Sequence, residues 1–412
     1  MTEARWLCRG QAAPWIGVAL VLLILSARKP DSFLNPQLWA EDGSVFFAQQ
    51  VEHGARAHLQ PYAGYFNEVP RIVASIAALL PHRHAPAVYN LAALLALLSL
   101  ILKLYSPRLD LPCPLPFALA VALVPHPDGE VFVCLANVQW VLALFLLAVV
   151  LQEGATTRAQ ALGDATAVLL AGLTGPFVIF ALPLLGWKIW RHRSRLDLPA
   201  SSIALGTALA QLWALLHSSI EAPPPTPPTP GVWLRLLGHR LVGTLFLGPQ
   251  LTYRWNPLVL SIAGLLVLGG ILWALRRSPE TLERAGLSLV FAGALTVGVL
   301  AKFAAAPSLL LPWANGARYF FIPAAVVAWC LLLVTARAPG AAPRLLAAAA
   351  LLAMLASSLL AGFRSPPLAD RRWAEQAERI GSSEAEVRIP INPEGWGVLI
   401  HQTKSIRKSR AD

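Results

Sequence analysis

Charged residues are scarce in this chain of 412 residues. Asp, Glu, Lys and Arg together make up 13% of it, whereas an ordinary soluble domain carries about a quarter. Hydrophobic residues reach 56%. A water-soluble fold has no core large enough for so many apolar side chains, so the composition excludes an ordinary soluble protein.

Familiar catalytic motifs are also missing. The chain contains no Gly-x-Ser-x-Gly, no Gly-Lys-Ser/Thr and no His-Glu-x-x-His, the motifs of serine hydrolases, phosphate-binding loops and zinc proteases. The four cysteines, at positions 8, 113, 134 and 330, do not have the spacing of a metal site. Chemistry must therefore be sought in single residues and their placement.

Apolar segments fill the chain from end to end. Several reach the ~20 residues that cross a bilayer as a helix, and we expect the first to remain as an uncleaved helix. The sequence predicts an all-α polytopic membrane protein. The apolar runs are 14–27, 85–104, 113–125, 137–151, 163–190, 198–217, 257–275, 285–305, 319–335 and 344–362.

The basic residues predict the orientation of these helices. They flank apolar runs, as cytoplasmic loops do, and this pattern explains the net charge of +11 without a nucleic-acid partner. Run 163–190 is interrupted by Thr174-Gly175-Pro176, which predicts two short helices. The result is about eleven membrane helices with the N-terminus inside and the C-terminus outside. Arg28-Lys29 conflicts with this scheme, because it falls outside.

The same topology predicts the domain organisation. Residues 1–362 form the membrane bundle, and residues 363–412 form a short outer-face tail of one helix and an extended piece that packs over the bundle. The predicted outer loops are 28–84, 126–136 and 218–256.

Two of the outer loops are acidic. In the first, Glu41 and Asp42 follow Trp39 directly, and Glu68 lies in a second aromatic stretch. Carboxylates among aromatic, interface-seeking residues are partly desolvated, which makes them candidates for a general base or metal ligands. A helix N-cap with surface charges is the alternative.

The second acidic loop carries Asp128 and Glu130 beside His126. Oxygen and nitrogen ligands at this spacing suit a divalent metal ion, although a turn containing Asp-Gly explains the residues equally well.

Positive and polar groups are predicted on the same face. Arg318, followed by Tyr319, opens an apolar helix, and Arg71 lies in the first loop. A guanidinium at this depth binds a phosphate or extends to lipid headgroups. Asn137 and Gln139 begin another helix, where they line a cavity or support helix packing.

Together these features resemble the GT-C superfamily of glycosyltransferases that use polyprenyl-phosphate-linked sugars, in a poorly characterised bacterial branch. The resemblance covers the layout of nearly the whole chain, but only short motifs in residues, and the large C-terminal soluble domain of better-known members is lacking. The similar segments are Trp39 to Phe47, Gly64 to Arg71, Asn137 to Trp140, Gly175 to Phe177 and Ile391 to Trp396.

The resemblance implies transfer of a sugar from a polyprenyl-phosphate-linked donor to an acceptor on the outer face of a bacterial inner membrane. Asp42, with Glu41 as the alternative, would act as base or bind a metal. The resemblance also implies that Glu68, Asp128 and Glu130 complete an acidic site. Arg318 and Arg71 would neutralise the departing phosphate. A transporter or flippase of lipid-linked sugars and a surface-polysaccharide polymerase or ligase are the alternatives.

Overall fold

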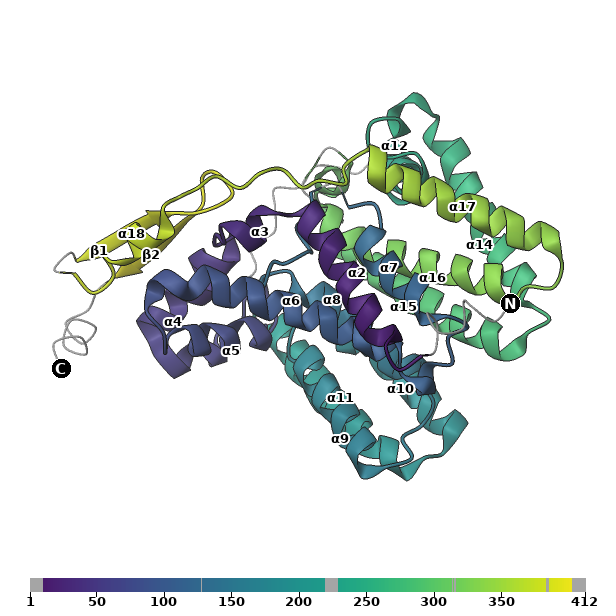
Figure 1. Ribbon diagram of the computed structural model, residues 1–412, viewed down its shortest axis with the longest axis horizontal. Helices are drawn as coiled ribbons and strands as arrows, with labels where there is room; N and C mark the ends of the chain where they lie inside the picture. Colours follow the sequence, from purple (N-terminus) through teal and green to yellow (C-terminus); the bar gives the residue numbers. More distant parts are fainter. Residues whose placement is uncertain are drawn as a thin grey trace.

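The computed structural model describes residues 10–126, 128–218, 229–312, 314, 316–382 and 385–401. The protein is mostly helical, at 71%, and its strands form a two-stranded sheet. This composition is consistent with the predicted all-α membrane protein. Figure 1 shows a bundle of helices with the C-terminal hairpin at one extremity. Parts of the predicted loop 218–256 and of the predicted tail, residues 219–228 and 402–412, lie outside the described residues.

The first half of the chain places a group of short helices between α2 and α6. In order, the elements are α2 (Ala13–Arg28), α3 (Asp31–Leu34), η1 (Asp42–Phe47), α4 (Ala48–His53), η2 (Gly54–Leu59), α5 (Glu68–Ala77), η3 (His82–His84), α6 (Ala85–Leu104), η4 (Pro107–Leu109), α7 (Pro114–Leu123), α8 (Val138–Leu151), α9 (Arg158–Gly172), α10 (Phe177–His192), η5 (Arg195–Asp197) and α11 (Leu198–His217).

The second half contains the longest helices and ends in the hairpin. Its elements are α12 (Pro230–Arg235), η6 (Leu236–Gly243), α13 (Thr244–Phe246), η7 (Thr252–Arg254), α14 (Pro257–Leu275), α15 (Pro279–Lys302), η8 (Pro307–Leu310), η9 (Ala317–Phe320), α16 (Phe321–Arg337), α17 (Ala341–Leu360), α18 (Trp373–Ala377), β1 (Glu386–Pro390) and β2 (Gly397–His401).

The predicted count of about eleven membrane helices is not supported. Within the described residues, six helices are long and apolar enough to cross a bilayer, and α2, α7 and α8 are apolar but shorter. At 1.5 Å per residue, the ten residues of α7 reach only about half of a ~30 Å hydrocarbon core. The six are His82–Leu104, Arg195–His217, Pro257–Leu275, Pro279–Lys302, Ala317–Arg337 and Ala341–Leu360.

Burial separates the central helices from the peripheral ones. In the apolar window of Ala317–Arg337, 67% of the residues are buried, against 22% in the windows of α14 and α17. Leu265 and Leu266 of α14 are about 70% exposed. Large apolar side chains left open on long helices suit a lipid environment, because water would make their exposure unfavourable.

The predicted helix break at Thr174-Gly175-Pro176 is confirmed. Helix α9 ends at Gly172, α10 begins at Phe177, and Gly175 has a φ of 90°, which favours glycine. The break also binds the first loop, because Thr174 Oγ1 accepts from the Val69 amide at 3.1 Å.

Arg28 and Lys29, which conflict with the predicted orientation, point into the protein. Arg28 donates to the carbonyls of Ala122, at 2.8 Å, and His126, at 2.9 Å. Lys29 donates to the carbonyl of Phe132 at 2.8 Å. Both side chains are buried. They hold the second acidic loop in place, and buried, bonded cations are poor indicators of membrane orientation.

The extended piece predicted in the tail is an antiparallel hairpin of β1 and β2. Figure 1 shows the chain after α17 returning across the molecule to bring this hairpin beside α4. The Asn392 carbonyl accepts from the Ala40 amide at 2.5 Å, and Asn392 N donates to Leu38 O at 3.3 Å. Ile391 and Val398 pack on Gly43. The tail therefore supports the segment that contains Glu41 and Asp42.

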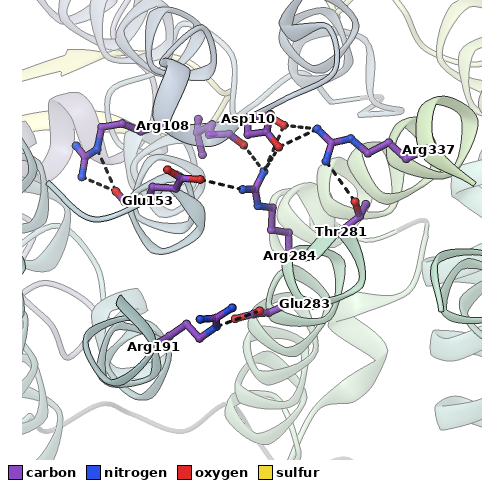
Figure 2. A network of polar contacts seen from close by, with 9 residues as sticks. Arg108, Asp110, Glu153, Arg191, Thr281, Glu283, Arg284 and Arg337 are labelled. Atoms are coloured by element: carbon purple, nitrogen blue, oxygen red, sulfur yellow. Dashed lines mark hydrogen bonds and ion pairs between the residues drawn. The ribbon is translucent and has the colours of Figure 1, made fainter. Parts of the chain in front are cut away.

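A network of ion pairs connects several helices at the end opposite Arg318. In Figure 2, Arg284 and Arg337 both reach Asp110 Oδ2, at 3.1 and 2.9 Å. Arg337 ends α16, whereas Arg318 lies at its other end. Burial opposes the charge of Asp110, but its hydrogen bonds with the two arginines hold the pKa of this carboxyl below its ordinary value. The α16 span thus has an ion-paired arginine at each end.

Candidate functional site

The start of α16 joins the second acidic loop through an ion pair. Arg318 donates to Glu130 Oε2 at 2.8 Å, and the guanidinium also lies 5.3 Å from the ring centre of Tyr319. The Glu130 side chain is 9% exposed and that of Arg318 is 26% exposed. The start of α16 and the second acidic loop therefore meet in space, and the Arg318 side chain stays partly exposed.

Asp42 fastens the first loop to the second. It begins the π-helical segment η1 and is only 1% exposed. Its Oδ1 accepts from the Ala136 amide at 2.7 Å, and Oδ2 lies 3.8 Å from Cys134 Sγ. Burial raises the pKa of the Asp42 carboxyl to about 8, although the Ala136 hydrogen bond opposes the rise. Near neutral pH this carboxyl is therefore mostly protonated.

Glu41 has a different environment from its neighbour. Its side chain is partly exposed and accepts a hydrogen bond from the Tyr62 hydroxyl at 3.1 Å. Burial raises the pKa of Glu130, Arg318 counters that rise, and the charges of Asp128 and Glu41 add to it. Glu41 is thus close enough to act electrostatically on the Glu130–Arg318 pair, and it is the more accessible member of the acidic pair.

Asp128 lies within electrostatic reach of two arginines. Burial raises the pKa of its carboxyl, and the positive charges of Arg240 and Arg318 counter the rise. With Glu130 it supplies two carboxylates. The parts of the chain that the structure describes contain no group of three His, Cys, Asp or Glu residues placed to hold a metal ion. The divalent metal ion stays a prediction.

Polar residues at the start of α8 support this cluster. Asn137 donates to the Glu130 carbonyl at 3.1 Å, and Gln139 donates to the Tyr65 hydroxyl at 3.3 Å. Lys302, at the end of α15, lies 5.8 Å from the ring centre of Tyr65. Asn137 thus positions the backbone of the acidic loop, and Gln139 and Lys302 both lie beside Tyr65.

Glu68 and Arg71 form contacts of their own. Glu68 Oε2 lies 2.7 Å from His58 Nδ1. Arg71 donates to the Gln60 carbonyl and lies over the ring of Phe46. Phe46 belongs to η1, the segment that begins at Asp42, so Arg71 packs against the element that carries the acidic pair.

An apolar cavity of about 550 Å³ adjoins the polar cluster. Residues of η6, α13, α14, α15 and α16 line it, and Arg240 is the charged group on its wall. Arg240 is 3% exposed, and within the described residues its Nε and Nη2 have no hydrogen-bond partner. Buried donors normally have partners, so this guanidinium is suited to an anion that enters with an apolar group.

Sequence reasoning missed several of these residues. Lys29, buried near the charges of Asp42 and Glu130, was interpreted only as a topological signal. Tyr62, Tyr65 and Arg240 have no recognisable catalytic motif around them in the sequence. The signal for Arg240 was its place between apolar residues of segment 236–245, where a charge is costly without a partner.

Comparison with known proteins provides no further assignment, because no family model, no curated protein and no solved structure matches the chain. Function must therefore be inferred from the site itself.

Proposed function

We propose that this membrane protein is a glycosyltransferase that moves a sugar from a polyprenyl-phosphate-linked donor to an acceptor on the extracytoplasmic face. One observation carries the proposal. Arg240, whose Nη1 donates to the Pro312 carbonyl but whose Nε and Nη2 have no partner among the described residues, lines an apolar cavity beside the carboxylates Asp128 and Glu130 and the second cation Arg318. A ligand that satisfies both parts has an apolar chain and an anionic group.

The donor would place its apolar chain in the cavity and its phosphate near Arg240. The cavity volume falls within the ~300–1,000 Å³ that is usual for ligand sites, and paired hydrogen bonds make arginine a strong phosphate ligand. As the bond between the sugar and the phosphate oxygen breaks, negative charge grows on the leaving phosphate. Arg240 and Arg318 would stabilise this charge.

Glu41 is the better base on grounds of access. A base must come within hydrogen-bond reach of the acceptor hydroxyl, and Glu41 is partly exposed whereas Asp42 is buried against Ala136. Glu41 would take the hydroxyl proton as the acceptor oxygen bonds to the sugar carbon, and polyprenyl phosphate would leave. Asp42 would position Glu41 by holding η1 against the second loop.

The other residues predicted to bind substrate would support the groups that contact the donor. Tyr319 packs beside Arg318, and Asn137 and Gln139 border the same polar cluster. A divalent ion at Asp128 and Glu130 would neutralise the carboxylates when bound. We place the site on the outer face of a bacterial inner membrane, with the N-terminus inside and the C-terminus outside.

A transporter or flippase is less well supported by the distribution of charge. Such a pathway needs ionisable groups near the membrane centre, whereas the two ion-pair clusters described here lie at opposite ends of α16. A polysaccharide polymerase or ligase would use the same chemistry and differs only in the acceptor.

The test compares purified wild type with Glu41→Gln, Asp42→Asn and Arg254→Ala for release of polyprenyl phosphate from lipid-linked sugars. Arg254 is an exposed arginine of η7 and serves as the control. We expect Glu41→Gln to lower kcat by about 10²-fold or more and Arg254→Ala to match wild type. Full turnover in Glu41→Gln would reject Glu41 as the base. Absence of turnover with every donor class would reject the transferase.

A further inference from the structure

Three side chains of the first outer loop form a relay outside the site described above. Glu68 Oε2 lies 2.7 Å from His58 Nδ1, and His58 Nε2 lies 3.0 Å from Ser75 Oγ. Glu68 and Ser75 are seven residues apart on α5, so the helical repeat places them on the same face. His58, from η2, lies between them.

We propose that Ser75, His58 and Glu68 are a second catalytic centre, one that transfers acyl groups from carboxylic esters. The order of contacts, from carboxylate to one imidazole nitrogen and from the other nitrogen to a serine hydroxyl, is that of a nucleophile activated by a general base. Such a centre is recognised by geometry and not by sequence order. A serine nucleophile of this kind can therefore exist in a chain without the Gly-x-Ser-x-Gly motif.

The proton positions in the relay follow from Glu68. A carboxylate accepts hydrogen bonds, so it favours the imidazole tautomer with the proton on Nδ1 and leaves Nε2 free to accept the Ser75 hydroxyl proton. Ser75 Oγ also lies 3.0 Å from Gln50 Oε1. The hydroxyl has one proton, so these two acceptors compete for it, and the reactive state is the one with the proton directed at His58.

The surroundings indicate the class of ester. Ser75 is partly buried, and the His58 side chain is 30% exposed, so the relay is open to a substrate. The neighbouring Leu59 is 78% exposed, and Ile72 and Ile76, on either side of Ser75, are 38% and 51% exposed. Apolar side chains around an open hydroxyl favour an ester with an apolar acyl chain, as an amphiphile at a membrane surface presents it.

A cation lies one helical turn before the nucleophile. Arg71 and Ser75 are four residues apart on α5 and are therefore neighbours on its surface. Among the described residues, Arg71 Nε and Nη1 have no partner, although the side chain is 1% exposed. Its Nη2 donates to the Gln60 carbonyl and its guanidinium lies over the Phe46 ring, so its charge would act on the oxyanion through the local field and not by direct contact.

The reaction has two balanced steps. Ser75 Oγ bonds to the carbonyl carbon while its proton passes to His58 Nε2. The ester bond then breaks, and the leaving alcohol takes that proton. Water, or an acceptor alcohol, next gives its proton to His58 and attacks the acyl-serine, which releases the acid or a new ester and returns the proton to Ser75. Glu68 is a positioning residue in both steps.

The experiment uses the full chain, purified in detergent, with a fluorophosphonate probe and p-nitrophenyl esters of increasing chain length. We expect the probe to label wild type and not Ser75→Ala. His58→Gln should lower esterase kcat by about 10²–10⁴-fold. Glu68→Gln should lower kcat without changing KM. Ser99→Ala is the matched control, because Ser99 is an exposed serine whose hydroxyl donates to the Leu95 carbonyl of its own helix.

The outcomes separate this centre from a structural role. Labelling that persists in Ser75→Ala, or a folded wild type that neither labels nor cleaves esters, would overturn the proposal. Gln50→Leu removes the acceptor that competes for the Ser75 proton, so this variant should retain or increase labelling. A folded Gln50→Leu variant that loses labelling would also count against the proposal. The test also separates this centre from the proposed glycosyl transfer. Asp42→Asn alters the segment assigned to glycosyl transfer, and we expect the fluorophosphonate probe to label this variant as it labels wild type.

Discussion

Arg318 and Glu130 are 188 residues apart in the chain and form an ion pair of 2.8 Å between Nη1 and Oε2. This pair joins the start of α16 to the second acidic loop and places a cation beside the carboxylate cluster. Glu130 is almost fully buried, so it would act mainly on the stability of the fold. Arg318 is partly exposed, so it can also contact a ligand. Substitutions can separate the two.

Arg318→Ala should lower glycosyl transfer by about 10²–10³-fold, the range for removing one group that stabilises developing charge. Glu130→Gln should lower it less, because the cation remains. In thermal unfolding, a double-mutant cycle should give a coupling free energy of about 1–2 kcal/mol, since the two groups touch and Arg318 is partly screened by solvent. Additive single-variant effects would show that the pair does not stabilise the fold.

Asp42 should make stability depend on pH. Its pKa in the folded protein is raised to about 8, above that of an unfolded Asp at about 3.9. The folded state therefore binds more protons between these values, and the free energy of unfolding should fall as pH rises from about 4 to 8. Asp42→Asn keeps the shape without the charge, so it should weaken this fall.

The measurement for Asp42 is the Tm of wild type and Asp42→Asn at pH 5 and pH 8. The variant should gain at least about 1 kcal/mol relative to wild type at pH 8, because one pKa unit corresponds to about 1.4 kcal/mol. Equal pH slopes in the two proteins would contradict the raised pKa. Asp110→Asn is a useful comparison, because burial opposes the charge of this carboxyl but its arginine contacts hold its pKa low.

Filling the apolar cavity should weaken donor binding. Gly293 lines the cavity, and a Cβ placed there meets no atom within 4 Å. Gly293→Leu should therefore occupy the cavity without distorting α15, and KM for a long-chain donor should rise about tenfold or more, the equivalent of roughly 1.4 kcal/mol. Gly286→Leu is the matched control, since Gly286 is also unobstructed on α15 but does not line the cavity.

Arg240→Ala should raise the same KM by about tenfold, because a charge-assisted hydrogen bond contributes roughly 1.5–3 kcal/mol. The effect should depend on the donor phosphate and not on chain length, whereas that of Gly293→Leu should grow with chain length. Identical chain-length profiles in the two variants would show that cavity and guanidinium bind different molecules.

The tail should support the site through Asn392. Its side chain is 4% exposed and bonds to Ala369 twice, with Oδ1 accepting at 3.0 Å and Nδ2 donating at 2.8 Å. Asn392→Ala should lower the free energy of unfolding by about 1–3 kcal/mol and lower glycosyl transfer by displacing Ala40 and Glu41. Arg388→Ala, an exposed change on β1, should do neither. Unchanged turnover in Asn392→Ala would show that the tail does not position the site.

Some of the sequence predictions followed from local physics and survive. The low charge and long apolar runs require a membrane class, because no aqueous core could bury them. Thr174-Gly175-Pro176 must interrupt a helix, since proline lacks a donor and glycine adopts a positive φ. The number of spanning helices does not follow from the apolar runs alone, because an apolar composition does not determine where a short helix such as α7 ends.

Only the tertiary structure decided which charges meet. The sequence does not show that packing of η2 on α5 pairs Glu68 with His58. It presented Arg28-Lys29 as a surface signal, yet both side chains turn inward to bond carbonyls about a hundred residues away. Hydrophobic pattern is a local property, whereas the partner of a charge depends on how distant helices pack.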